Sequence, residues 1–253
     1  MTSLLETKEV IKDFGGLRAV NGCSIAAERG EICGLIGPNG AGKTTLFDLI
    51  TGFYKPTAGT IWFKGERIDG LEPHTICLRG LVRTFQIARE LRNMTLLENM
   101  LLAPKGQQGE RLGHSIVKPP AVRAQERENL GKALRILGIV GLSHLKDELA
   151  GNLSGGQRKM LEVGRALMTD PEMLLLDEPT SGANFEETRK LMDYITTLRK
   201  EKGLTFLVVE HKMEVIMNLC DRIFVMNYGE NLAEGTPQEV QQNPKVIEAY
   251  LGA

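Results

Sequence analysis

A glycine-rich stretch near the N-terminus carries the residue types that bind phosphate. The segment GLIGPNGAGKTT runs from an apolar strand through a turn into a helix that we expect to begin near Lys43. Gly37, Gly40 and Gly42 let backbone N–H groups converge on phosphate oxygens, and the helix N-terminus adds partial positive charge. Lys43 can reach the terminal phosphates, and the hydroxyl of Thr44 can bind Mg²⁺. The sequence therefore predicts a nucleoside triphosphate site formed by Gly37, Pro38, Asn39, Gly40, Ala41, Gly42, Lys43, Thr44 and Thr45.

Two adjacent carboxylates follow a second apolar run, MLLLDEPTSG, at residues 173–182. The run predicts a strand that is covered on both faces of a parallel sheet. Ligands bind at the carboxyl ends of such strands. We expect Asp177 to hold Mg²⁺ and Glu178 to polarise an attacking water. An exposed turn before Pro179 would also explain the pair, but the phosphate loop favours a hydrolytic site.

A third motif, LSGGQ, lies between these two sites. Ser154 is a candidate N-cap, and Gly155 and Gly156 open the helix that follows. This helix N-terminus is therefore a second place that attracts an anion. A single chain has no need of two sites for the same terminal phosphate.

LSGGQ shortly before LLLDEP resembles the signature of the ATP-binding-cassette (ABC) ATPases. In that superfamily two subunits enclose two ATP molecules, and the signature of one subunit faces the phosphate loop of the other. The resemblance implies that Ser154, Gly155, Gly156 and Gln157 contact ATP held by a partner subunit. It also implies ATP hydrolysis, with Glu178, His211, Gln86 and Lys43 in catalytic roles.

Three further residues match the family in order along the chain. Gln86, in VRTFQ, matches the glutamine that contacts the metal and links the nucleotide to the membrane subunits. His211, in FLVVEHKM, matches a histidine that contacts the γ-phosphate, and Phe14, in KDFGGLRAV, matches an aromatic residue that stacks on adenine. The resemblance makes Thr44, Gln86 and Asp177 the Mg²⁺ ligands. Gln86, His211 and Phe14 each have an ordinary alternative: a surface Gln, a surface His at a strand end, and a core Phe.

One position departs from the pattern of many ABC proteins. Asn184, in SGAN, stands where an Asp is common in the loop that contacts the other subunit. Asn keeps hydrogen-bonding capacity but carries no fixed charge. A role that depends on that charge is therefore in doubt here.

These motifs require an α/β fold that brings distant segments together. We expect a P-loop NTPase (RecA-like) core, an N-terminal antiparallel β subdomain and an inserted α-helical subdomain, which is the ABC ATPase fold. The predicted core comprises residues 1–85 and 166–253, and the predicted helical subdomain comprises residues 86–165. Within the latter, the apolar spacing predicts a helix that buries one face with Leu130, Leu134, Leu137 and Ile139.

The composition excludes several other classes. A formal net charge of −1 gives no reason to expect nucleic acid as a partner. No apolar run is long enough to span a bilayer, and the N-terminus lacks a signal-peptide pattern, so we expect a peripheral protein at the cytoplasmic face of the inner membrane. The four cysteines lack metal-site spacing; we interpret them as core-filling residues.

Over essentially its whole length the chain resembles the ATPases of branched-chain amino acid importers, through LVRTFQIARELRNMTLLENMLLAP and the C-terminal GENLAEGTPQEVQQNPKVIEAYLGA. That resemblance implies two permeases, a homologous but shorter second ATPase subunit and an external substrate-binding protein as partners. The two ATPase subunits would form a heterodimer, or this chain a homodimer in isolation. A permease helix is expected to dock on the surface after Gln86, at Arg89, Leu91, Met94 and Leu97. Alternatives are importers of urea, amides or other amino acids, a lipopolysaccharide exporter, a non-transport ABC ATPase and a P-loop kinase.

Overall fold

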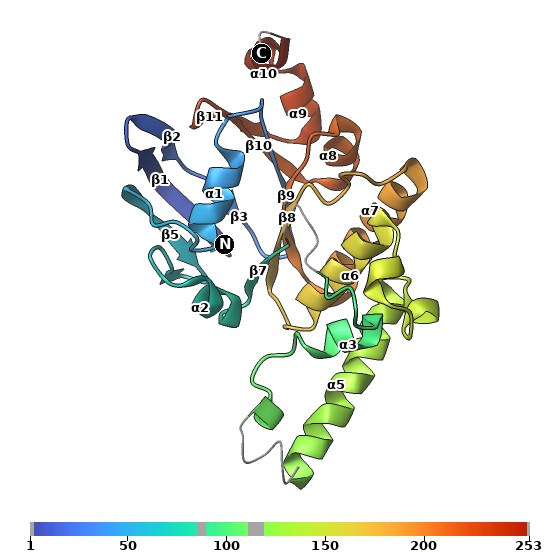
Figure 1. The fold of residues 1–253 in the computed structure, drawn as a ribbon. Helices are drawn as coiled ribbons and strands as arrows, with labels where there is room; N and C mark the ends of the chain where they lie inside the picture. The colour runs from blue at the N-terminus through green and yellow to red at the C-terminus, as the bar shows by residue number, and fades with distance from the viewer. Residues whose placement is uncertain (1–2, 85–89, 111–118, 252–253) are drawn as a thin grey trace.

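The computed structural model describes residues 3–84, 90–110 and 119–251. Figure 1 shows two sheets side by side, with most of the helices on the outer side of the larger sheet. The strands are β1 (Leu5–Phe14), β2 (Leu17–Cys23), β3 (Ala26–Ala27), β4 (Ile32–Ile36), β5 (Ala58–Phe63), β6 (Glu66–Arg67), β7 (Leu81–Arg83), β8 (Met173–Asp177), β9 (Thr205–Val209), β10 (Arg222–Asn227) and β11 (Glu230–Gly235). The helices are α1 (Lys43–Ile50), α2 (Pro73–Leu78), α3 (Leu96–Leu101), α5 (Pro120–Ile139), α6 (Gly155–Leu167), α7 (Phe185–Lys202), α8 (Met213–Leu219), α9 (Pro237–Gln242) and α10 (Pro244–Leu251).

The larger sheet places the predicted motifs at one edge. Its strand order over the described residues is β11-β10-β4-β9-β8-β7, and all neighbouring pairs are parallel except β10 with β11. The phosphate loop follows β4, the carboxylate pair ends β8, and His211 follows β9. Because the three strands are parallel neighbours, their carboxyl ends bring these segments to the same place.

Both faces of this sheet are covered, which explains the unbroken apolar strands. In β8, Leu174 and Leu176 join the core under α5, α6, α7 and α8, whereas Met173 and Leu175 join the core around α1 and the smaller sheet. Alternate side chains of a strand point to opposite faces. The helix α1 therefore lies between the two sheets, as Figure 1 shows.

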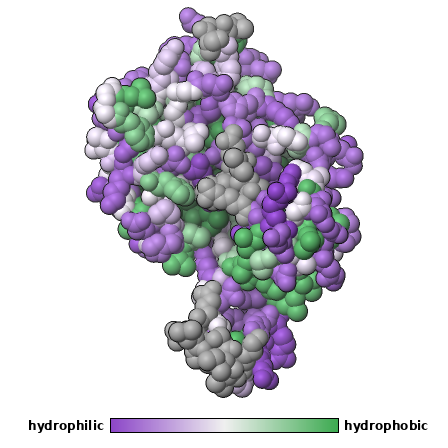
Figure 2. Space-filling model, viewed as in Figure 1, coloured by the Kyte–Doolittle hydropathy of each residue, from purple (hydrophilic) through white to green (hydrophobic). Residues whose placement is uncertain are grey.

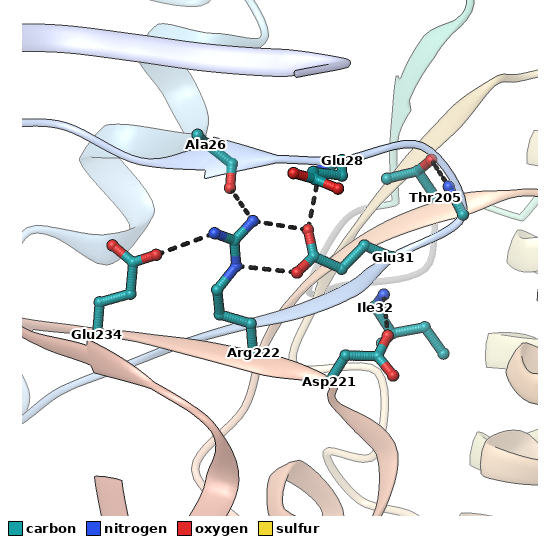
Figure 3. A network of polar contacts seen from close by, with 9 residues as sticks. Ala26, Glu28, Glu31, Ile32, Thr205, Asp221, Arg222 and Glu234 are labelled. Atoms are coloured by element: carbon teal, nitrogen blue, oxygen red, sulfur yellow. Dashed lines mark hydrogen bonds and ion pairs between the residues drawn. The ribbon is translucent and has the colours of Figure 1, made fainter. Parts of the chain in front are cut away.

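The smaller sheet is antiparallel, with the order β2-β1-β5-β6 and β3 beside β1. A polar network joins β3 and the segment that follows it to the larger sheet (Figure 3). Arg222 donates from Nε and Nη2 to the two carboxylate oxygens of Glu31, at 2.9 and 2.8 Å, and from Nη1 to Glu234 at 3.0 Å. Its Nη2 also donates to the backbone oxygen of Ala26 at 2.7 Å. One guanidinium thus links the β10–β11 hairpin to the segment of Ala26 and Glu31, which lies more than 190 residues earlier in the sequence.

The long helix α5 corrects one expectation. Its buried side chains are Val122, Ala133, Ile136 and Leu137, whereas Leu130 and Leu134 are 38% and 42% exposed. The predicted packed face was therefore wrong at Leu130 and Leu134. The helix packs against α3 and α6, and its N-terminal part projects beyond them (Figure 1), so only some turns of its apolar stripe meet a neighbour.

The cysteines are free, with Cys23, Cys33 and Cys220 buried and Cys77 partly buried, which agrees with core filling. Among the helices in the described ranges, none is long and apolar enough to cross a membrane. The predicted division into residues 1–85, 86–165 and 166–253 stays a prediction.

Candidate nucleotide site

The phosphate loop between β4 and α1 has a backbone that only glycine can adopt at two positions. Gly37 has a φ of 151°, and a Cβ there would lie 2.1 Å from the backbone oxygen of Met226. Gly42 has a φ of 95°, and its Cβ would lie 2.4 Å from the backbone oxygen of Ala19. Both the dihedral angles and these close approaches exclude a side chain. The loop is consequently held tightly against β10 and β2.

Lys43 lies at the centre of the loop with only 6% of its surface exposed. Its Nζ donates to the backbone oxygens of Gly37 at 2.7 Å and Pro38 at 2.9 Å. Burial lowers the pKa of Lys43, and the charges of Glu178 and Asp177 oppose that shift. The Lys43 ammonium is bonded only to uncharged carbonyl oxygens in these two contacts, and a phosphate anion would be a stronger partner for it.

A cavity of about 420 Å³ opens over the loop. The predicted residues Asn39, Gly40, Ala41, Gly42, Lys43, Thr44, Thr45, Glu178 and His211 line it, together with Leu17, Arg18, Ala19, Val209 and Tyr228. The fold thus gathers the phosphate loop, the strand-end glutamate and the histidine around one space. Leu17, Arg18 and Tyr228 were not predicted, because no motif marks them.

Phe14 lies outside this lining. Phe14 is 40% exposed, and its ring packs edge-on against Tyr54 with 5.1 Å between ring centroids. The ammonium of Lys12 lies 4.9 Å from the centroid of the Phe14 ring. An exposed, positively flanked ring can accept a base. Its stacking on adenine stays a prediction.

Asp177 is 4% exposed at the end of β8 and is paired with Arg83 from the neighbouring strand β7. Arg83 also forms an ion pair with Asp48 of α1, and its guanidinium lies 5.6 Å from the ring centroid of Phe47. This arginine joins the helix after the phosphate loop to the acidic strand. Sequence reasoning missed it, since its partners are 35 and 94 residues away.

Glu178 has a strained backbone and a histidine partner. Its φ is 46°, a left-handed value that is uncommon for a residue with a side chain, and its N–H donates to Val209 O at 2.9 Å. Its Oε1 lies 3.1 Å from Nε2 of His211. Strain of this kind often marks a functional position. The predicted catalytic side chains of Glu178 and His211 are thus within hydrogen-bond distance of each other.

Glu210, which sequence reasoning also missed, links the backbone after Glu178 to the backbone of His211. It is 3% exposed and accepts hydrogen bonds from the backbone N–H groups of Thr180 at 2.7 Å and His211 at 3.1 Å. Lys212 adds bonds from Nζ to the backbone oxygens of Thr180 and Ala183. The loop after Glu178 is thereby tied to the end of β9.

The signature segment forms the predicted helix start. Ser154 is the N-cap of α6, its Oγ accepts from Gln157 N at 3.1 Å, and the Gln157 side chain accepts from Ser154 N at 2.9 Å. This reciprocal pair is a capping box. Ser154 and Gly155 are exposed, while Gly156 is buried. The tip of the helix is therefore open to solvent on the serine side.

Asn184 turns out to be the N-cap of α7. Its Oδ1 accepts from Glu187 N at 2.9 Å, and the Glu187 carboxylate accepts from Asn184 N at 3.1 Å. Asn and Asp cap helices about equally well. The substitution thus keeps a structural role that does not require charge. Gln86 and Arg89 lie outside the described residues.

Comparison with known proteins gives a consistent result. A family model described as "ABC transporter" matches residues 20–181, and one described as "Branched-chain amino acid ATP-binding cassette transporter" matches residues 230–253. The chain is 45% identical to the high-affinity branched-chain amino acid transport ATP-binding protein LivG of Salmonella typhimurium, over 98% of each chain. It is 44% identical to the corresponding protein BraF of Pseudomonas aeruginosa, again over 98% of each.

Solved structures agree with these relatives. A nucleotide-free ATP-binding cassette from an ABC transporter superimposes with a TM-score of 0.86 at 39% identity, covering 100% of both chains. The ADP conformation of an ATP-binding cassette of an ABC transporter gives a TM-score of 0.87 at 38% identity, also over 100% of both. A dimeric cassette bound to ADP and Pi gives 0.76 at 26% identity, over 92% of this chain and 98% of that one.

The chain belongs to the ABC transporter family. It has the ABC ATPase fold, binds nucleotide and is an ATP-hydrolysing subunit of a transporter. The predicted fold class and activity are confirmed. The roles of individual site residues stay predictions.

Proposed function

We propose that this chain energises the import of branched-chain amino acids by binding and hydrolysing Mg-ATP beneath a pair of permeases. The observation that carries the chemistry is the contact between Glu178 and His211 at 3.1 Å, beside a cavity lined by the phosphate loop. What supports the solute is identity over the full length to LivG and BraF, together with the match of residues 230–253.

In the proposed site, the loop residues 37–45 bind the phosphates and Lys43 turns from the loop carbonyls to the γ-phosphate. Hydroxyl and carboxylate oxygens are the donors that Mg²⁺ prefers, and Thr44 and Asp177 supply them, with Gln86 as a further ligand. The metal would neutralise charge on the β- and γ-phosphates. Glu178 orients the attacking water, and His211 holds the Glu178 carboxylate and contacts the γ-phosphate.

The proposed assembly contains a second ATPase subunit, two permeases and an external substrate-binding protein. Ser154, Gly155, Gly156 and Gln157 contact the nucleotide of the second subunit. The permeases hold the chain at the cytoplasmic face of the membrane. Figure 2 shows apolar side chains gathered over the helical part of the molecule. Leu91, Leu102 and Leu149, which are 45%, 50% and 43% exposed, supply apolar surface in that part for a permease.

Reconstitution tests this proposal. The chain is co-expressed with its permeases and second ATPase subunit, purified from detergent-solubilised membranes and placed in liposomes that contain ATP. Leucine carried by the binding protein should be taken up and should stimulate hydrolysis, whereas urea should do neither. The matched control is Glu178→Gln, which should assemble normally but transport nothing. Recovery of the chain only with non-membrane partners, or uptake of another solute class in place of leucine, would refute the proposal.

A further inference from the structure

One carboxylate joins the two segments of this chain that are proposed to face a partner's ATP. Glu187 lies in the first turn of α7, and its Oε1 accepts a hydrogen bond from Ser154 Oγ at 3.1 Å. Its Oε2 accepts from Asn184 N at 3.1 Å. The same side chain therefore holds the signature tip, residues 154–157, and the contact loop, residues 181–184. The helices that carry them, α6 and α7, are packed against each other.

The signature helix is shaped to receive this carboxylate. A Cβ on Gly156 would lie 2.4 Å from Cδ and 2.5 Å from Oε1 of Glu187, so the Glu187 side chain lies directly on the buried glycine. Any larger residue at Gly156 would push Glu187 away from Ser154. The contact with Glu187 in the same chain therefore explains why the second glycine of LSGGQ has no side chain.

The contact also fixes the hydroxyl of Ser154. That hydroxyl donates to Glu187 and accepts from Gln157 N at 3.1 Å, so its orientation is set from two sides. The hydroxyl has one proton, so it must turn from Glu187 before it can donate to a phosphate oxygen. Glu187 therefore holds the tip in place in the chain before pairing.

The contact loop is anchored on its other side as well. Lys212 Nζ donates to Thr180 O at 3.1 Å and Ala183 O at 3.3 Å. The outer surfaces remain exposed in the described chain: Ser154 and Gly155 on the tip, Ser181 and Asn184 on the loop. Phe185, directly after the loop, is 73% exposed.

We propose that Glu187 is a positioning residue that ties the signature tip to the contact loop, so that both meet the partner's phosphate loop as one piece. This inference rests on the nucleotide sandwich of the proposed function. If Glu187 served only as the capping partner of Asn184, its loss would loosen α7 without a specific effect on pairing of subunits.

Sedimentation of slowly hydrolysing chains tests the inference. Glu178→Gln is mixed with the companion ATPase subunit and Mg-ATP, alone or combined with Glu187→Ala or Glu187→Gln. Glu187→Ala should raise the Kd of pairing by about tenfold, since a charge-assisted hydrogen bond is lost. Glu187→Gln should raise the Kd less, by about threefold, because its single amide oxygen can accept either the bond from Ser154 Oγ or the bond from Asn184 N, but not both. Binding of a fluorescent ATP analogue to the single chain should not change.

Glu186→Ala is the matched control. Glu186 is also a carboxylate in the first turn of α7, but its side chain is 73% exposed and is paired with Lys190, so its removal should leave pairing unchanged. If the Glu178→Gln chain does not pair with the companion subunit in the presence of Mg-ATP, the proposed sandwich is refuted. If it pairs, and the variant that also carries Glu187→Ala pairs equally well, only the role of Glu187 is refuted. Equal weakening by both alanine variants also refutes it.

If Glu187→Ala folds poorly, Gly156→Ala alone still tests the inference, because it displaces Glu187 and should weaken pairing. If Glu187→Ala folds, the Gly156→Ala change should weaken pairing less in that background, where the added methyl has room. Strict additivity of the two changes in pairing would contradict the inference, since residues in contact are expected to couple.

Discussion

Arg83 donates a hydrogen bond from Nη2 to Oδ2 of Asp177 at 2.7 Å, with 9% and 5% of the two side chains exposed. The pair connects the edge strand β7 to the acidic end of β8, and the ion pair of Arg83 with Asp48 extends it to α1. The segment that leaves β7 leads to Gln86. Arg83, three residues before Gln86 in the sequence, therefore links the end of β7 to the acidic strand and to the helix after the phosphate loop.

Replacing Arg83 should destabilise the protein strongly. Arg83→Ala leaves the buried carboxylate of Asp177 without its counter-charge, which costs about 3–5 kcal/mol. Arg83→Lys keeps the charge but not the two-pronged geometry, so its cost should be smaller. Urea unfolding followed by circular dichroism measures both. Arg18→Ala, which breaks an exposed ion pair with Asp13, is the control and should leave the midpoint close to wild type; a similar small effect of Arg83→Ala would contradict the prediction.

Glu178 and His211 should behave as one unit in hydrolysis. Glu178→Gln should retain ATP binding and lower the hydrolysis rate by about 10²–10⁴-fold, the usual contribution of a positioned base. Adding His211→Ala should lower the rate little further, because residues that act together are not additive. Phosphate release under saturating Mg-ATP measures this, with Glu214→Gln as a nearby control. A product of two independent losses in the double variant would argue against the shared role.

The Glu31–Arg222 pair should make stability depend on pH in acid. Burial alone would raise the pKa of Glu31, but the hydrogen bonds from Arg222 and from Glu28 N lower it below its ordinary value. A carboxylate with a lowered folded-state pKa contributes stability above its unfolded pKa, about 4.3, and loses it as pH falls through the folded pKa. Glu31→Gln should therefore cost about 1–2 kcal/mol at pH 7 and progressively less below about pH 4.5. Thermal unfolding of both proteins from pH 7 to pH 3 measures the difference, and a constant difference over that range would contradict the assignment.

The four cysteines should differ sharply in reactivity. Burial raises the pKa of Cys23 and Cys220 to about 12, and Cys33 is fully buried, so thiolates are scarce at these three positions at pH 8. Cys77 is partly buried and should be alkylated first by iodoacetamide. Peptide mass spectrometry before and after unfolding in urea reads each site. Rapid native labelling of Cys23 or Cys220 would show that the core opens more readily than the packing implies.

The sequence by itself determined the features whose partners are close along the chain. The glycines of residues 37–42, the capping box of Ser154 with Gln157 and the apolar strands before Asp177 and His211 each depend on spacing within a few residues. Local spacing sets backbone conformation, helix starts and strand burial, so these were predictable. The family resemblance supplied the fold that assembles them.

Only the tertiary structure decided which distant residues meet. Arg83 reaches Asp177 across 94 positions, and Ser154 reaches Glu187 across 33. Neither contact has a motif, because any arginine or glutamate in the chain is an equal candidate until the strand order and the packing of α6 against α7 are fixed. The same holds for α5, where the neighbours that cover a turn, and not its apolar spacing, determine that Ala133 is buried and Leu134 is exposed.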